Sequence, residues 1–139
     1  MKVKLLRNIQ KFILEQPDQF TMDLWVRGER KGASGQTLCK TAGCIAGWAV
    51  IVTDMKKGMK CEDAINKMEN GASVSCEAHG RKALGLTKRQ GERLFFTQNW
   101  PNGLGREYDE QMDVYENRSK AAQIASDRID LFIETKGQK

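Results

Sequence analysis

Cys44 has the residue type and position of a catalytic nucleophile. It lies near the expected start of an apolar helix, where backbone amides and the helix dipole favour a thiolate. A cysteine nucleophile also needs a general base, and the chain's one histidine, His79, falls on a different expected helix. The alternative is that Cys44 is a small buried core residue, the usual environment of an unpaired cysteine. A cysteine-dependent enzyme is therefore kept as an alternative, and a non-enzymatic role is favoured.

Metal binding is a second chemistry that these residue types allow. Cys76 and His79 stand three residues apart, on one face of a helix, and Cys39 and Cys44 offer two further ligands. The spacing differs from that of a standard zinc ribbon or finger, and Cys44 belongs to an apolar helix. We therefore expect no metal and no other cofactor, and these four residues are the candidates to test.

A helical hairpin at residues 75–96 suggests a third chemistry, DNA binding. Its turn, Leu-Gly-Leu-Thr-Lys-Arg-Gln at 84–90, is similar to the turn and start of a recognition helix. The basic side chains that would face phosphates are Lys88, Arg89 and Arg93. Two positions depart from the motif, because Arg81 replaces the expected small residue and Gly91 the expected β-branched one. An ordinary hairpin with a glycine-terminated first helix explains the same sequence.

The segment 27–40 is the long, glycine-bearing loop of the chain, and long loops in compact domains are usually functional or mobile. It leads to Thr41, a residue type that caps helix N-termini, where backbone amides attract phosphate or carboxylate. Its glycines match no phosphate-binding motif. Tryptophans would add a stacking surface, although they are equally explained as core residues. The expected ligand-binding residues are Arg27, Arg30, Lys31, Lys40, Thr41, Trp48 and Trp100.

The elements that position these residues are predicted to be helices, in an all-α single domain covering residues 1–139. Residues 42–53 are almost entirely apolar, which predicts a buried helix at the centre of a compact bundle of five to six helices. Gly43 and Gly47 each cost about 1 kcal/mol relative to alanine in a helix, so another backbone or a ligand must approach closely. The other expected helices are 4–16, 62–69, 75–84, 88–96 and 118–135. No strand is expected, and 106–116 reads as a polar connection.

The composition limits where in the cell the protein is expected and which partners it could bind. No apolar run approaches the ~20 residues that cross a bilayer, and the N-terminus lacks the apolar core of a signal peptide. We therefore expect a cytoplasmic protein with reduced cysteines and no membrane association. The net charge of +5 is a mild bias that suits an anionic partner.

Two stretches carry a resemblance. The first is CKTAGCIAGWA at residues 39–49, and the second, at 84–101, contains Leu-Gly-Leu-Thr, Leu-Phe and Trp-Pro. Together they resemble a group of uncharacterised small helical proteins of bacteria and bacteriophages, over residues 5–135. The resemblance implies a helical fold and, for a phage protein, a role in binding and neutralising a host factor.

The combined prediction is a binding protein that captures an anionic partner at the rim formed by residues 27–41. The partner would be a nucleotide-like small molecule or a charged surface of a host protein. The DNA-binding hairpin and the cysteine-dependent enzyme remain the alternatives, and the oligomeric state is left open.

Overall fold

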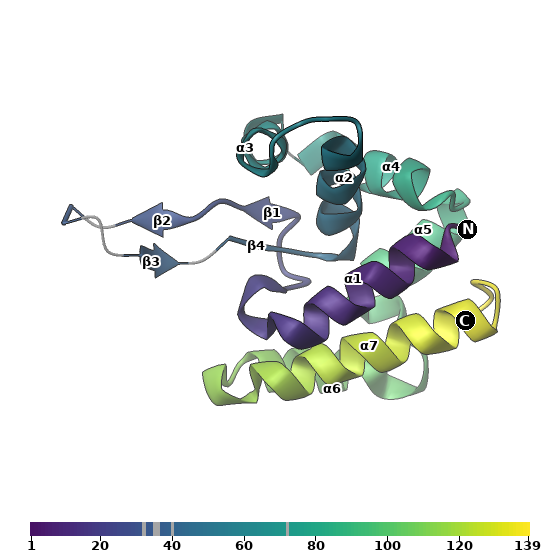
Figure 1. Cartoon of the computed structure of the whole chain (residues 1–139). Coiled ribbons are helices and arrows are strands. Elements are labelled where there is room, and N and C mark those ends of the chain that lie inside the picture. The colour runs from purple at the N-terminus through teal and green to yellow at the C-terminus, as the bar shows by residue number, and fades with distance from the viewer. Residues whose placement is uncertain (32, 35–36, 40, 72) are drawn as a thin grey trace.

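The computed structural model describes residues 1–31, 33–34, 37–39, 41–71 and 73–139, and its described part contains seven α-helices and a small β-ribbon (Figure 1). The helices are α1 (Val3–Glu15), α2 (Ile45–Lys56), α3 (Cys61–Gly71), α4 (Ser73–Leu84), α5 (Lys88–Phe95), α6 (Leu104–Met112) and α7 (Arg118–Glu134). The strands are β1 (Val26–Arg27), β2 (Arg30–Lys31), β3 (Thr37–Cys39) and β4 (Ala42–Gly43). The predicted all-α class is confirmed.

Helix α2 is the central helix, as its apolar sequence predicts. It lies between α3 and α4 and also packs against α1 (Figure 1). The fully buried side chains that it contributes to the core include Ile45, Ala46, Ala49 and Ile51. These residues fill all sides of the helix because every side meets another element.

The start of α2 differs from the prediction. Cys44, and not Thr41, is the N-cap: its backbone is extended, and its Sγ accepts a hydrogen bond from the Gly47 amide at 3.4 Å. Ala42 and Gly43 precede the helix because they form β4, which pairs with β1. Because Ala42 and Gly43 pair with β1, their backbone groups are not available for the hydrogen bonds of a longer helix.

Gly47 and Gly43 both lie against the backbone of Trp25. A Cβ on Gly47 would overlap the Trp25 carbonyl oxygen, and one on Gly43 would stand 2.9 Å from the same atom. That oxygen also accepts a hydrogen bond from the Cys44 amide at 3.1 Å. The predicted close approach of another backbone is confirmed, although Gly43 belongs to a strand and only Gly47 to the helix.

The expected loop at 27–40 is in fact part of an antiparallel β-ribbon. Strand β1 pairs with β4, and β2 pairs with β3 through Arg30 with Cys39 and Lys31 with Thr37. The β2–β3 pair extends away from the helices (Figure 1). Strands of two or three residues are too short to show an alternating pattern, which is why the sequence predicted no strand.

Helix α6 replaces the polar connection expected at 106–116. Its apolar residues Leu104, Tyr108 and Met112 recur every four positions, and this stripe packs toward the core. Tyr108 is fully buried, and its hydroxyl accepts a hydrogen bond from the Met22 amide at 3.0 Å. Helices α1, α6 and α7 form the second side of the molecule, where α7 packs on both α1 and α6. No helix in the described ranges is both long enough and apolar enough to cross a membrane.

Candidate functional site

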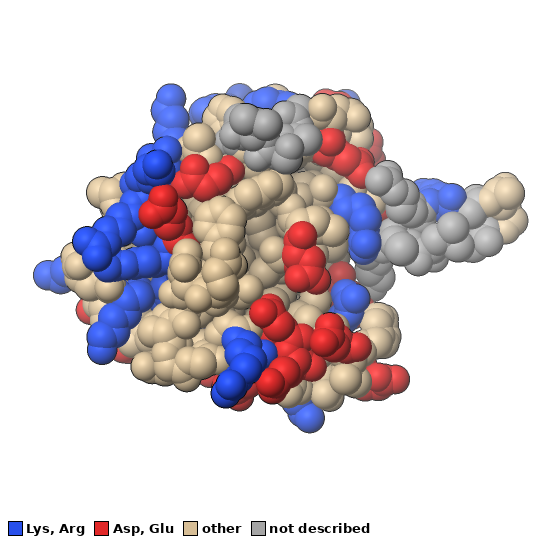
Figure 2. All heavy atoms as spheres, turned by 180° about the vertical axis from the view of Figure 1, so that it is seen from behind, with Lys and Arg blue, Asp and Glu red and all other residues tan. Residues whose placement is uncertain are grey.

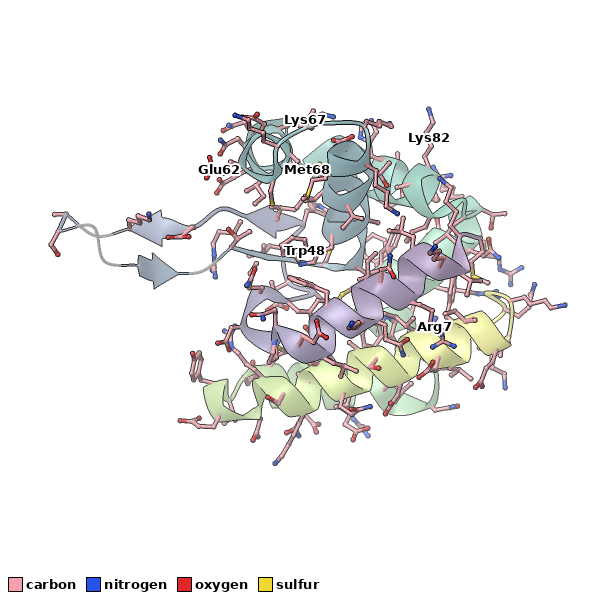
Figure 3. All side chains as sticks on the ribbon, in the orientation of Figure 1. Arg7, Trp48, Glu62, Lys67, Met68 and Lys82 are labelled. Atoms are coloured by element: carbon pink, nitrogen blue, oxygen red, sulfur yellow. The ribbon has the colours of Figure 1, made fainter. Side chains whose placement is uncertain are left out.

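A basic cavity of about 400 Å³ opens where α2, α3, α4 and the beginning of the chain meet. Its charged and polar lining residues are Lys2, Lys57, Lys67, Lys82, Asp54, Thr53 and His79, and we call this site the lysine pocket. Its apolar wall consists of Val50, Met68 and Ala83. Figure 3 shows Lys67 and Met68 on α3 and Lys82 on α4, on the two sides of α2.

Each lysine of this pocket comes from a different element. Lys57 follows the last residue of α2, Lys82 lies in the last turn of α4, and Lys67 lies on α3. The Lys2 amide donates a hydrogen bond of 2.6 Å to the Leu84 carbonyl, which ties the N-terminus to the end of α4. Basic residues near helix C-termini are favoured by the helix dipole, which explains Lys57 and Lys82. Lys2, at the N-terminal end of α1, and Lys67, before the last turn of α3, have no such explanation.

A close helix crossing determines how these elements converge. A Cβ on Gly80 of α4 would stand 2.7 Å from the Ala46 Cβ of α2, so only glycine allows this approach. Small residues at the crossing bring the two backbones together, and the longer lysines beyond the crossing then surround one cavity.

The pocket contains more positive than negative charge. Asp54 is the one carboxylate among its lining residues, it is 8% exposed, and its Oδ2 lies 2.8 Å from the Lys67 Nζ. Within the described residues, Lys2, Lys57 and Lys82 make no ion pair with a carboxylate. The pocket can therefore accept at least one negative charge from a ligand.

The rim predicted at 27–41 lies beside carboxylates. Lys31 and Thr41 line a cavity of about 340 Å³, and the Lys31 Nζ lies 3.6 Å from a Glu29 oxygen. The acidic residues of this cavity are Glu29, Glu62 and Glu69. The Nε of Arg27 is buried without a hydrogen-bond partner. The Arg30 side chain and Lys40 lie outside the described residues. The cavity beside Lys31 and Thr41 is lined by one lysine and three glutamates, two of them from α3.

The two tryptophans expected to stack on a ligand are core residues. Trp48 is 7% exposed, packs on Phe12 with 4.5 Å between ring centroids, and donates from Nε1 to the Gln19 carbonyl. Its edge lines a separate apolar cavity of about 300 Å³. Trp100 is 5% exposed, and its Nε1 donates to the Leu94 carbonyl at 3.0 Å. Both side chains therefore have structural roles, and neither lines the cavity beside Thr41 or the lysine pocket.

Cys44 and Cys76 are buried thiols. Burial raises the pKa of Cys44 to about 11, and the hydrogen bond from the Gly47 amide offsets only part of that effect. Burial, followed by the nearby Cys44, raises the pKa of Cys76 to about 12. The buried position of Cys44 agrees with the core-residue alternative and disfavours a thiolate, because desolvation outweighs the effect of the helix N-terminus.

The candidate metal ligands are separated by burial. Cys76 is fully buried, whereas His79 is exposed at the lysine pocket, so the pair does not present two ligands to one site. The Cys39 side chain lies outside the described residues. Among the residues that the structure describes, no group of three or more histidine, cysteine, aspartate or glutamate side chains could hold a metal ion.

The turn of the 75–96 hairpin forms as predicted. Gly85 has a φ of +64°, and Thr87 and Gln90 form a capping box at the start of α5. The two residues that depart from the helix-turn-helix motif contact each other: a Cβ on Gly91 would lie 2.9 Å from the Arg81 Cδ. The small residue therefore sits on the second helix instead of the first, and the close helix contact is kept.

The C-terminal segment covers part of α5. Gln90 Nε2 donates to the Lys136 carbonyl, and Arg93 Nη1 donates to the Gly137 carbonyl, both at 3.0 Å. Lys88 and Arg89 remain exposed. A DNA duplex would thus meet two of the three basic residues that the motif predicted, because Arg93 is held by the chain itself.

The sequence contains no local signal for the lysine pocket. Its lysines are far apart along the chain, and among the predicted site residues only His79 lines it. Comparison with known proteins adds no candidate function. No protein-family model, curated protein or solved structure matches this chain.

Proposed function

We propose that this chain is a non-enzymatic binding protein that captures a small anionic ligand in the lysine pocket. The observation that carries the proposal is the convergence of Lys2, Lys57, Lys67 and Lys82 on one cavity whose lining includes a single carboxylate. A volume of about 400 Å³ lies within the usual range of small-molecule sites.

The chemistry of the lining favours a phosphorylated or polyanionic small molecule. Lysine ammonium groups bind phosphate as mobile point charges and do not require the planar geometry that arginine recognises. The described lining contains no tryptophan, tyrosine or phenylalanine, and the imidazole of His79 is its one ring, so a nucleotide would gain little from base stacking there. Val50, Met68 and Ala83 offer a wall for a short apolar part of the ligand.

The rival functions have less support from the side-chain geometry. The thiol of Cys44 is buried with a raised pKa, which disfavours nucleophilic catalysis at neutral pH. On the hairpin, Arg93 is engaged by the C-terminal segment, which leaves a smaller basic surface for DNA.

Calorimetric titration with inorganic phosphate, pyrophosphate and ATP at low ionic strength tests the proposal. We expect the polyanions to bind more tightly than phosphate and to raise the melting temperature by mass action. Lys57→Gln and Lys82→Gln should each weaken binding by about tenfold, which corresponds to ~1.4 kcal/mol. The matched control is Lys11→Gln, since Lys11 is exposed on α1 and lies outside the pocket.

Equal weakening by Lys11→Gln would show a general charge effect and would contradict a defined site. The absence of any heat or melting shift with all three probes at millimolar concentration would also rule out the proposed ligand class. Duplex DNA in a parallel titration tests the rival, because binding lost in Lys88→Gln and Arg89→Gln but kept in Lys82→Gln would favour the hairpin.

A further inference from the structure

A second cavity, of about 450 Å³, lies between residues 22–26, α3 and the end of α5. Its wall includes three aromatic residues, the buried Phe95 and the more exposed Trp25 and Phe96. The ring centroids of Trp25 and Phe96 are 6.0 Å apart in an edge-to-face arrangement. Trp25 and Phe96 are only partly buried, so ring surface remains accessible to a ligand. We call this site the aromatic cavity.

Carboxylates stand beside these rings. Asp23 lines the cavity and is exposed. Its position is held by Thr21, whose hydroxyl accepts from the Asp23 amide at 3.2 Å and donates to its carboxylate at 3.3 Å. Glu69 lines the opposite wall, and it fits there because Gly28 has no side chain: a Cβ would lie 2.7 Å from Glu69 Oε2.

Further carboxyl groups lie near Asp23. Burial raises the pKa of Asp109 on α6, and the negative charges of Asp23 and Asp113 raise it further. The negative charges of Asp23 and Asp113 are therefore close enough to affect Asp109. Asp23 is the member of this group that lines the cavity, so a cation in the cavity would lie next to it. On the face seen from behind, acidic side chains gather at the lower right next to uncharged surface (Figure 2), and basic side chains lie along the left edge and also among the acidic ones.

The cavity wall is held in place by buried hydrogen bonds. The Met22 amide donates to the Tyr108 hydroxyl, and the Trp25 carbonyl accepts from the Cys44 amide. At the other wall, the Trp100 indole donates to the Leu94 carbonyl at the end of α5. A ligand would consequently find a preformed site and would not have to order it.

We propose that the aromatic cavity binds a small organic cation, an alkyl- or arylammonium ion whose charge lies over the Trp25 and Phe96 rings and close to Asp23. A cation over an aromatic face gains ~0.5–2 kcal/mol, depending on how far it is desolvated. The apolar walls accept the alkyl or aryl groups that an inorganic cation lacks. This inference is independent of the lysine pocket, which has the opposite charge.

Nuclear magnetic resonance titration tests this inference with choline and benzyltrimethylammonium as probes. The indole N–H signals separate the three tryptophans, because the indoles of Trp48 and Trp100 are buried and hydrogen-bonded while Trp25 is partly exposed. We expect both cations to shift the Trp25 signal and to leave the other two nearly unchanged. The uncharged isostere of choline, 3,3-dimethylbutan-1-ol, should bind at least about fivefold more weakly, given the strength of a cation–aromatic contact.

Two variants and one control assign the site. Asp23→Asn and Trp25→Leu should each weaken choline binding by roughly 3- to 30-fold, the range that a cation–aromatic or charge contact supplies. Asp127→Asn makes the same charge change on α7, outside the cavity, and should leave the affinity unchanged. Equal binding of choline and its uncharged isostere would overturn the proposal, and so would unchanged affinity in Asp23→Asn or the absence of a Trp25 shift. The isostere comparison uses the unmodified protein, so it decides the question even if Trp25→Leu does not fold.

Discussion

Gly47 is the residue that allows α2 to pack against residues 22–26. A side chain there would meet the Trp25 carbonyl, which is itself held by the Cys44 amide. Gly91 is a second helical glycine in a close contact, but its neighbours are the flexible ends of Arg81 and Glu77. The two positions therefore differ in how easily the neighbour can move.

We expect Gly47→Ala to destabilise the protein by more than about 2 kcal/mol, because a backbone oxygen cannot withdraw. Gly91→Ala should change the free energy of unfolding by less than about 1 kcal/mol, since the better helix propensity of alanine offsets the displacement of Arg81. Chemical denaturation of both variants measures the difference. Similar stability of the two variants would show that the contact between α2 and Trp25 is adaptable.

Among the residues whose burial the structure describes, Arg128 has the largest fully buried side chain. Its Nη2 donates to the Arg93 carbonyl at 3.0 Å, its guanidinium lies over the Phe132 ring, and Nε and Nη1 have no hydrogen-bond partner. Burial, followed by the positive charge of Arg93, lowers its pKa to about 10. The hydrogen bond to the Arg93 carbonyl links α7 to the end of α5.

At the scale of elements, α5 shows how a short helix ends without a glycine. Three of its last carbonyls accept side-chain hydrogen bonds: Glu92 from Asn99, Arg93 from Arg128 and Leu94 from Trp100. These donors satisfy groups that have no partner inside the helix. The helix therefore stops in a defined conformation, with Phe96 placed at the aromatic cavity.

Helix α6 carries Asp109, whose pKa is raised first by burial and then by Asp23 and Asp113. A carboxyl group with a raised pKa binds its proton more tightly in the folded state, so its contribution to stability falls as pH rises through that pKa. Asp109→Asn removes this unfavourable charge. We expect the variant to melt at a higher temperature than the wild type at pH 7.

The same substitution should have little effect at about pH 3, where the carboxyl group is largely protonated. Thermal melts at the two pH values, with Asp127→Asn as the control on α7, measure the effect. A lower melting temperature for Asp109→Asn at pH 7 would show that its hydrogen bond with Thr97 matters more than the repulsion.

For the molecule as a whole, the two cavities share one wall residue, Met68 of α3. The lysine pocket on one side is positive, and the aromatic cavity on the other side is bordered by carboxylates. Helix α3 thus separates two environments of opposite charge, and it contributes Lys67 to the first and Glu69 to the second. Methionine suits this position because its flexible side chain adapts to either surface.

Cysteine labelling reports on the integrity of the whole core. Cys44 and Cys76 are buried with raised pKa values, whereas Cys61 is exposed. With iodoacetamide, we expect Cys61 to react at once and the two buried thiols at least about 100-fold more slowly, because they must wait for an opening that costs several kcal/mol. Peptide mapping by mass spectrometry follows each site. Labelling of Cys44 as fast as that of Cys61 would instead support the cysteine-enzyme hypothesis.

The sequence by itself determined the features that depend on neighbours three or four residues apart. The stripe of α1, the apolar helix α2, the Gly85 turn and the Thr87 capping box all arise from contacts within one or two turns. Gly47 was also identified correctly, since a glycine inside an apolar helix is costly unless something packs there. The stripe at Leu104, Tyr108 and Met112 was equally local and would have predicted α6.

Only the tertiary structure decided where function can lie. The β-ribbon depends on the pairing of β1 with β4 and of β2 with β3. Strands of two or three residues have no recognisable sequence pattern, so this pairing could not be predicted. The lysine pocket depends on the crossing of α2 and α4 at Ala46 and Gly80, which brings together lysines up to 80 positions apart, from 2 to 82. The rim predicted from neighbouring basic residues instead lies beside the carboxylates of α3. The tertiary packing, and not the distance along the sequence, determines which charged groups lie near a side chain.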